Sequence, residues 1–183
     1  SLLRWGISHP ETLLNGIESN FEGIYQFENL VPHNNKMVND THTGFKFHTK
    51  MQSENGAFVH DHEERIIIHK EEFERIMHLR GKFVDNIQNP RMHYIYKKNA
   101  GLDFRFCSKL AEAISSKGPG CLLVVHLSDA DHASGSVMKV EDNLYFGYID
   151  SFAGYGTSDQ FDLDQWDNLA VNALKCMPQL PNS

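Results

Sequence analysis

Acidic and histidine side chains gather directly after the most apolar stretch of the sequence. Residues 121–127 (CLLVVHL) are almost continuously apolar, which is typical of a strand covered on both faces. The next residues include Asp129, Asp131 and His132. Because open α/β sheets bind ligands beyond the carboxyl ends of their strands, we predict these three as substrate-binding residues, able to serve as base, orienting group or ligand. The alternative is a polar loop that leads into a hairpin.

Histidines also stand two residues apart in a polar segment. Eleven of the 183 residues are histidines, and His60 and His62 are among them. In an extended segment both imidazoles would face the same side and could reach one metal ion. Glu63, Glu64 or His48 could complete the ligand set. A single pair supplies only two ligands, so we predict no metal and no cofactor, and a metal-binding protein that uses His60 and His62 stays the alternative.

The three cysteines have the spacing of structural residues. Cys107 falls in an amphipathic helix and Cys121 opens the apolar strand, so both are expected to be small buried hydrophobes. An odd count without a CxxC motif predicts no disulfide framework and favours a reducing cytoplasm. Nucleotide-binding glycine loops and the GxSxG elbow of serine hydrolases are absent from the sequence.

Composition limits the class of protein and its partners. The chain of 183 residues is 40% hydrophobic and contains 12 Phe, which predicts an ordered core and one domain over 1–183. A formal charge of −7 argues against non-specific binding of nucleic acid. No apolar run approaches the length of a membrane span. The composition does not distinguish among the remaining partners, which are an unknown small molecule, a glycan or a protein. Because the chain starts without Met, we allow for N-terminal truncation.

Hydrophobic periodicity predicts an alternation of helices and strands. The expected helices lie near 10–20, 70–87, 103–116 and 163–175. The expected strands lie near 45–50, 92–97, 121–127, 137–141 and 144–149. Residues 22–42 and 52–65 are expected to be irregular or polar. This order is typical of the α/β class, and we predict a three-layer α/β sandwich with a mostly parallel central sheet and an antiparallel hairpin extension.

Short motifs along most of the chain are shared with one protein family. They are Leu3-Arg4-Trp5-Gly6, Pro10-Glu11-x-Leu13, Phe21-Glu22-Gly23, Asn29-Leu30, Asn39-Asp40-x-x-x-Gly44-x-x-x-His48 and 147–152 (GYIDSF). The sequence thereby resembles a bacterial family labelled papain-like cysteine peptidases. Members of that family are often associated with surface-polysaccharide enzymes.

The resemblance implies a histidine base but no nucleophile. His48 matches the family's histidine position, with Asp40 or Asp150 as the acid that orients it. The family's cysteine follows a Ser-Leu-Gly strand ahead of the tryptophan that matches Trp5, and this chain begins after that point. A Cys–His–acid site needs all three groups, so the resemblance implies an accessory or binding module in surface-polysaccharide assembly. The alternative is a hydrolase or transferase that uses His48 and a nearby Asp.

Overall fold

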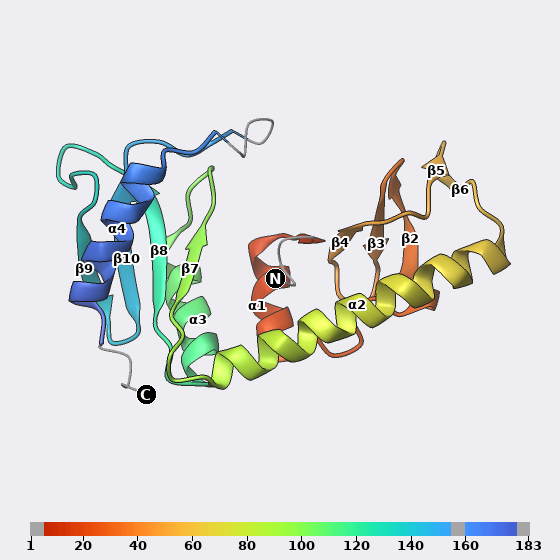
Figure 1. Cartoon of the computed structure of the whole chain (residues 1–183), viewed down its shortest axis with the longest axis horizontal. Coiled ribbons are helices and arrows are strands. Elements are labelled where there is room, and N and C mark those ends of the chain that lie inside the picture. The colour runs from red at the N-terminus through yellow and green to blue at the C-terminus, as the bar shows by residue number, and fades with distance from the viewer. Residues whose placement is uncertain (1–5, 155–159, 179–183) are drawn as a thin grey trace. The chain divides into compact units, whose positions relative to one another are not determined.

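The computed structural model describes residues 6–154 and 160–178 (Figure 1). The chain divides into two compact units, Ser1–Asn86 and Ile87–Ser183, and each is described by itself. Helices and strands alternate in a mixed parallel and antiparallel arrangement, so the α/β class is confirmed. The single domain over 1–183 stays a prediction.

The 1–86 unit is built on a four-stranded antiparallel sheet. Its order is β1 (Gly6–Ile7), β4 (Lys46–His48), β3 (Met37–Asp40) and β2 (Leu30–Asn34). Helix α1 (Pro10–Glu18) follows β1, a 3-10 turn (Phe27–Asn29) precedes β2, and a small hairpin joins β5 (Ser53–Glu54) to β6 (Ala57–Phe58). The strand expected at 45–50 therefore belongs to an antiparallel sheet separate from the other predicted strands.

Strands β2 and β3 replace the irregular segment expected at 22–42. Pro32 and the Asn34-Asn35 pair suggested breaks in regular structure. Pro32 lies on β2, an edge strand, where its missing N–H leaves no ladder bond unmade. Asn35 lies in the turn between β2 and β3. Pro32 and Asn35 thus lie on an edge strand and in a turn of the sheet.

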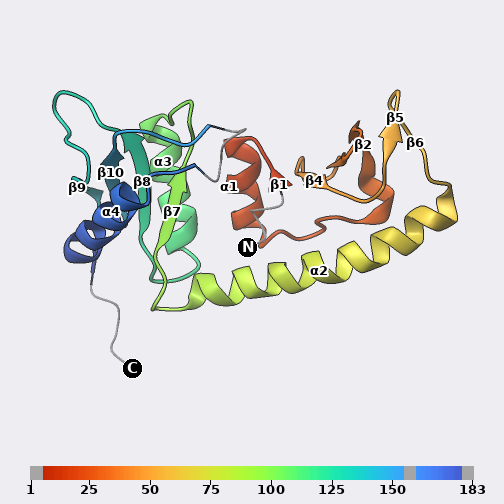
Figure 2. The same ribbon diagram turned by 45° about the horizontal axis from the view of Figure 1, so that its top comes forward.

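Helix α2 (His62–Gln88) begins eight residues before the predicted position and runs without interruption (Figure 2). Asp61 and Glu64 form a capping box at its start: the Glu64 N–H donates to Asp61 Oδ1 at 2.9 Å, and the Asp61 N–H donates to Glu64 Oε2 at 3.2 Å. Its first turns were expected to be a polar loop because charged residues dominate them. In the described parts of the chain, each helix is too short or too polar to cross a bilayer.

The 87–183 unit contains a four-stranded mixed sheet. Its order is β7 (Tyr94–Lys97), β8 (Leu122–Leu127), β10 (Leu144–Ile149) and β9 (Val137–Glu141). β8 lies between β7 and β10 and is parallel to both. β9 pairs with β10 as the expected antiparallel hairpin, but β10 also pairs in parallel with β8, which the sequence does not predict. Two of the three strand pairs are parallel, so the sheet is mixed.

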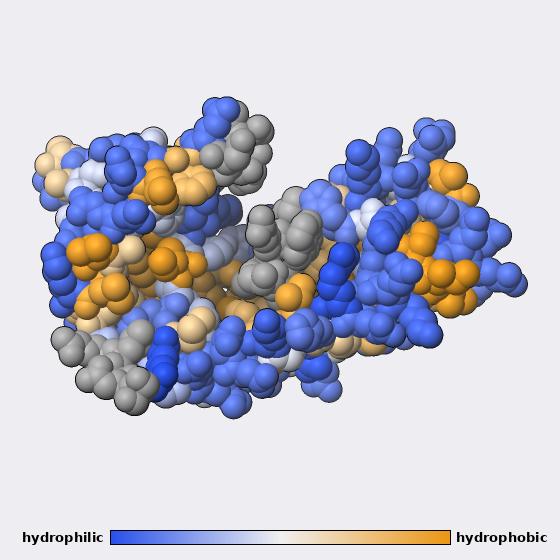
Figure 3. Space-filling view, viewed as in Figure 1, coloured by the Kyte–Doolittle hydropathy of each residue, from blue (hydrophilic) through white to orange (hydrophobic). Residues whose placement is uncertain are grey.

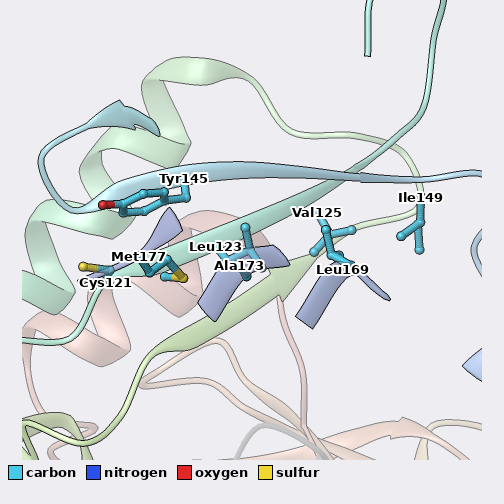
Figure 4. Packing of buried hydrophobic residues seen from close by; sticks show 8 residues of the cluster. All are labelled: Cys121, Leu123, Val125, Tyr145, Ile149, Leu169, Ala173 and Met177. Carbon is cyan, nitrogen blue, oxygen red and sulfur yellow. The ribbon is translucent and has the colours of Figure 1, made fainter. Parts of the chain in front are cut away.

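Helices α3 (Phe104–Ser115) and α4 (Leu163–Cys176) begin at aspartates, because Asp103 and Asp162 each accept a backbone N–H from the first turn. Leu169 and Ala173 of α4 pack on alternate residues of β8 and β10 (Figure 4). Helix α3 also contacts β8 and β10. Its Phe104 ring packs against Phe146 of β10. The neighbours of Phe146 in the strand, Tyr145 and Gly147, face α4 instead. Side chains alternate across a strand, so α3 and α4 cover different faces of the sheet.

Polar residues dominate the surface, with apolar patches between them (Figure 3). Large apolar side chains exposed at the start of α2 include Val59, Ile66 and Ile67. On α4 they include Val171 and Leu174.

Candidate functional site

The carboxyl ends of three neighbouring strands border a cavity in the 87–183 unit. β7, β8 and β10 run parallel, so these ends lie at one edge of the sheet. The cavity has a volume of about 420 Å³ and is lined by residues 98–101, residues 125–127, Asp129 and three aromatic rings. The rings are those of Phe146, Tyr148 and Phe152. Open α/β sheets bind ligands at this edge, and the volume is typical of small-molecule sites.

Asp129 and His132 form a hydrogen-bonded pair at this edge. Asp129 Oδ1 accepts from His132 Nδ1 at 2.8 Å and from the N–H groups of Asp131 and His132, each at 2.9 Å. These bonds, with the Asp131 N–H as the largest cause, hold the pKa of Asp129 below its ordinary value. Because a carboxylate only accepts, His132 Nδ1 is the donor, and Nε2 is the acceptor of the neutral ring.

The His132 ring stacks on Tyr148, which lines the cavity. The two ring centroids are 4.3 Å apart and the planes differ by 6°. The structure thus brings Asp129 and His132 together, and their role in substrate binding stays a prediction. Asp131 contributes its backbone N–H, while its exposed side chain makes no hydrogen bond to another described residue.

His126 lines the cavity, and the Nε2 atom of its ring is buried without a hydrogen-bond partner among the described residues. The ring meets Phe146 at a centroid distance of 4.6 Å. Burial lowers the pKa of His126, and the charge of His132 lowers it further. The ring is therefore neutral at pH 7. A buried polar atom without a partner is costly, so a ligand atom that bonded Nε2 would be favoured.

Asp150 connects the end of β10 to a loop and a helix. Its Oδ1 accepts from Ser128 Oγ at 2.7 Å, and its N–H donates to Gln165 Oε1 at 2.8 Å. Asp150 therefore joins the ends of β8 and β10 to α4. It belongs to the 87–183 unit whereas His48 belongs to the 1–86 unit, so its role as the acid for His48 stays a prediction.

The β3–β4 ladder separates the other predicted pair, His48 and Asp40. His48 lies opposite Met37, while the Asp40 N–H bonds the Phe45 carbonyl at the far end of the ladder. His48 is exposed and Phe47 is buried, as the strand alternation predicts. The His48 side chain makes no hydrogen bond or ion pair with the other described residues.

Asp40 instead stabilises the turn that follows β3. The carboxylate is fully buried. It accepts from the N–H groups of Tyr25, His42 and Thr43 and from the Thr43 hydroxyl, at 2.7–3.3 Å. Because four donors bond this carboxylate, Asp40 has a structural role and does not orient His48.

The extended segment assumed around His60 and His62 is replaced by the start of α2. His62 is the first helical residue, and its ring meets Phe27 edge-on at a centroid distance of 5.4 Å. The geometry that would direct both imidazoles to one side of a strand is therefore absent. Within residues 6–154 and 160–178, no group of three His, Cys, Asp or Glu side chains is placed to hold a metal ion.

The cysteines differ in exposure, which predicts their reactivity. Cys107 and Cys121 are buried and Cys176 is exposed. Burial, with the charge of Asp103, raises the pKa of Cys107 to about 11, and burial also raises the pKa of Cys121. At about pH 8 neither buried thiol has an appreciable thiolate fraction, and we expect a chromogenic disulfide reagent to label only Cys176 in the folded protein. The Cys176→Ser variant should lose the rapid labelling by this reagent. Rapid labelling of Cys107 would contradict the expectation that burial keeps this thiol unreactive.

Several lining residues were missed by the sequence analysis. They are Lys98, Asn99, His126 and Tyr148. Each lies within, or just after, a strand whose position was predicted. The carboxyl ends of the strands predicted at 92–97 and 144–149 lead to residues 98–101 and 150–152, so the rule that ligands bind at carboxyl ends also indicates these segments.

A search for relatives found no matching family model, no matching curated protein and no matching solved structure.

Proposed function

We propose that the 87–183 unit is a binding module for a small polyhydroxylated molecule, such as a sugar, which occupies the cavity at the strand ends. The unpartnered Nε2 of His126 is the observation that supports this best. Lys98 can only donate a hydrogen bond and the Asp129 carboxylate can only accept one. A hydroxyl group does both, so a ligand with several hydroxyls can satisfy all three side chains.

The rest of the lining supports a ring-shaped ligand in a fixed site. Aromatic rings on the wall offer apolar faces against which the C–H groups of a sugar ring can pack. The loop after β7 is held in place: Lys97 Nζ donates to Asn99 Oδ1 at 2.7 Å and lies 4.9 Å from the Phe152 ring centroid. Asn99 Nδ2 donates to the Ala153 carbonyl at 3.2 Å. A site already ordered loses less entropy on binding.

The sequence resemblance extends this proposal. It implies that the protein is a bacterial, papain-like relative, located in the cytoplasm and acting as an accessory module in surface-polysaccharide assembly. The three-layer arrangement is part of the same proposal, with α3 and α4 as the outer layers of the 87–183 unit. A sugar ligand fits that role.

Calorimetric titration of the full chain with a panel of neutral mono- and disaccharides tests the proposal. We expect saturable binding by at least one sugar, weakened about tenfold or more in His126→Ala and Lys98→Ala, because each variant leaves a ligand hydroxyl unpaired. Asp131→Ala is the matched control, since its exposed side chain lies in the same loop but outside the lining. Equal sugar affinities in the parent chain and the three variants, or no sugar binding at all, would refute the proposal.

A hydrolase is the second candidate, and the Asp129–His132 pair favours it. The 2.8 Å bond to Nδ1 is the arrangement that orients a histidine base. His132 would take a proton from a water molecule that attacks the ester carbonyl of the bound molecule, and would return that proton to the alcohol oxygen as the acyl–oxygen bond breaks. Release of acetate from acetylated sugars, lost in His132→Ala, would support this candidate over binding alone. Unchanged release in the variant would exclude His132 as the base.

A further inference from the structure

A second cavity, of about 340 Å³, lies in the 1–86 unit at the end of α1. Its lining comes from three short segments that the fold brings together. They are Asn15, Gly16 and Ser19 of α1 and its cap, Phe21 and Glu22 of the following loop, and His42, Thr43 and Phe45 of the turn before β4. It belongs to a different unit from the cavity at the strand ends.

Hydrogen-bond acceptors dominate this lining. Ser19 Oγ donates its proton to the Gly16 carbonyl at 3.3 Å, and Thr43 Oγ1 donates its proton to Asp40 Oδ2 at 2.7 Å. Thr43 Oγ1 also accepts from the Phe45 N–H at 3.5 Å, so each hydroxyl has at least one lone pair left for a ligand but no free proton. Glu22 adds a carboxylate, which only accepts. The ligand that suits this lining is a hydrogen-bond donor.

The local charge also favours a cation. The C-terminal end of a helix carries partial negative charge, and the last turn of α1 contains no basic residue. Glu22 lies four residues beyond the helix and adds a full negative charge. Arg80 donates to the Asn20 carbonyl at 2.7 Å, but it is not part of the lining. Among the described residues, the lining contains no lysine or arginine, and His42 is the one titratable base in it.

Two buried aromatic rings complete the lining. Phe21 and Phe45 are almost fully buried, and their ring centroids lie 5.6 Å apart at an interplanar angle of 50°. An organic cation within about 6 Å of such a ring is attracted by its negative face.

The loop behind the cavity is strained. Asn20, Phe21 and Tyr25 have φ angles of 52°, 55° and 61°. Residues other than glycine adopt this region at a cost, and such residues cluster at ligand sites. Hydrogen bonds hold the loop in this form: Phe21 N–H to the Gly16 carbonyl at 2.7 Å and Tyr25 N–H to Asp40 Oδ2 at 2.8 Å.

From these features we infer that the cavity at the end of α1 binds a small organic ammonium ion. An ammonium group has three donors and no acceptor, which matches the acceptors of Ser19, Glu22 and Thr43. Its alkyl group would lie against Phe21 and Phe45.

Titration of the isotope-labelled full chain with ethylammonium chloride, followed by amide NMR at about pH 8, tests the inference. At this pH imidazole groups are mostly neutral, so histidine does not compete for the carboxylate. We expect saturable shifts confined to residues 15–22 and 42–45, and no saturation with ethanol, the neutral analogue. Glu22→Gln should weaken binding by about fivefold or more.

Two further variants make the result decisive. Glu11→Gln removes an exposed carboxylate at the opposite end of α1 and should leave the affinity unchanged. Asn15→Lys places a lysine ammonium on the exposed rim and should abolish the shifts while the spectrum stays folded. Equal binding of ethanol, or equal affinity in Glu22→Gln and the parent, would overturn the inference. Neither result bears on the sugar titrations, which probe the other unit.

Discussion

The Glu72→Ala variant should lose about 3–5 kcal/mol of unfolding free energy. Glu72 is a carboxylate of α2 that is only 3% exposed. It accepts from Tyr25 Oη at 2.6 Å, from Thr49 Oγ1 at 2.8 Å and from the Lys50 N–H at 2.8 Å. Burial raises the pKa of Tyr25, so the phenol stays protonated and needs an acceptor. Alanine leaves three donors without a partner.

Denaturant unfolding monitored by circular dichroism measures this loss, and the neighbouring residue gives the control. Glu71 pairs with Lys50 Nζ at 3.3 Å, but both side chains are about two-thirds exposed. Exposed ion pairs contribute little, so Glu71→Ala should cost less than about 1 kcal/mol. Similar losses in the two variants would show that the buried hydrogen bonds of Glu72 do not stabilise α2 against the sheet.

The Gly118→Ala variant should lose about 2–3 kcal/mol, because the site has no room for a methyl group. A Cβ atom at Gly118 would clash with the Ile87 carbonyl oxygen, which is backbone and cannot rotate away. Gly81→Ala is the opposite case: nothing lies within 4 Å of its Cβ position, and it is inside α2. We expect that control to gain about 0.5–1 kcal/mol from helix propensity. An unchanged free energy of unfolding in Gly118→Ala would contradict the close approach of Gly118 to the Ile87 carbonyl.

Hydrogen exchange in these variants also tests the prediction of a single domain. Glu72 lies in the 1–86 unit and Gly118 in the 87–183 unit. If the chain unfolds as one cooperative domain, either variant should weaken amide protection in both units. If amide protection is lost only in the unit that contains the substitution, the prediction of a single domain is wrong and the chain has two domains.

Elements whose signals are local could be predicted from the sequence. Helix α3 has an N-cap at Asp103 and strand β8 is continuously apolar, and both lie within a residue or two of the predicted ranges. Two further local signals were present but not used. Asp61 and Glu64 have the spacing of a capping box, which would have placed the start of α2. Asn55-Gly56 is the turn of the β5–β6 hairpin.

The α/β class, the helices of the 87–183 unit and the loop that contains Asp129 and His132 can be predicted from the sequence, because caps, apolar periodicity and turn residues act over a few positions. Which side chains come together depends on the packing of the whole chain. The separation of Asp40 from His48 follows from the register of β3 and β4. The meeting of His126, Tyr148 and Lys98 follows from the parallel pairing of three strands distant in sequence. Register and pairing depend on long-range burial, which no local pattern specifies.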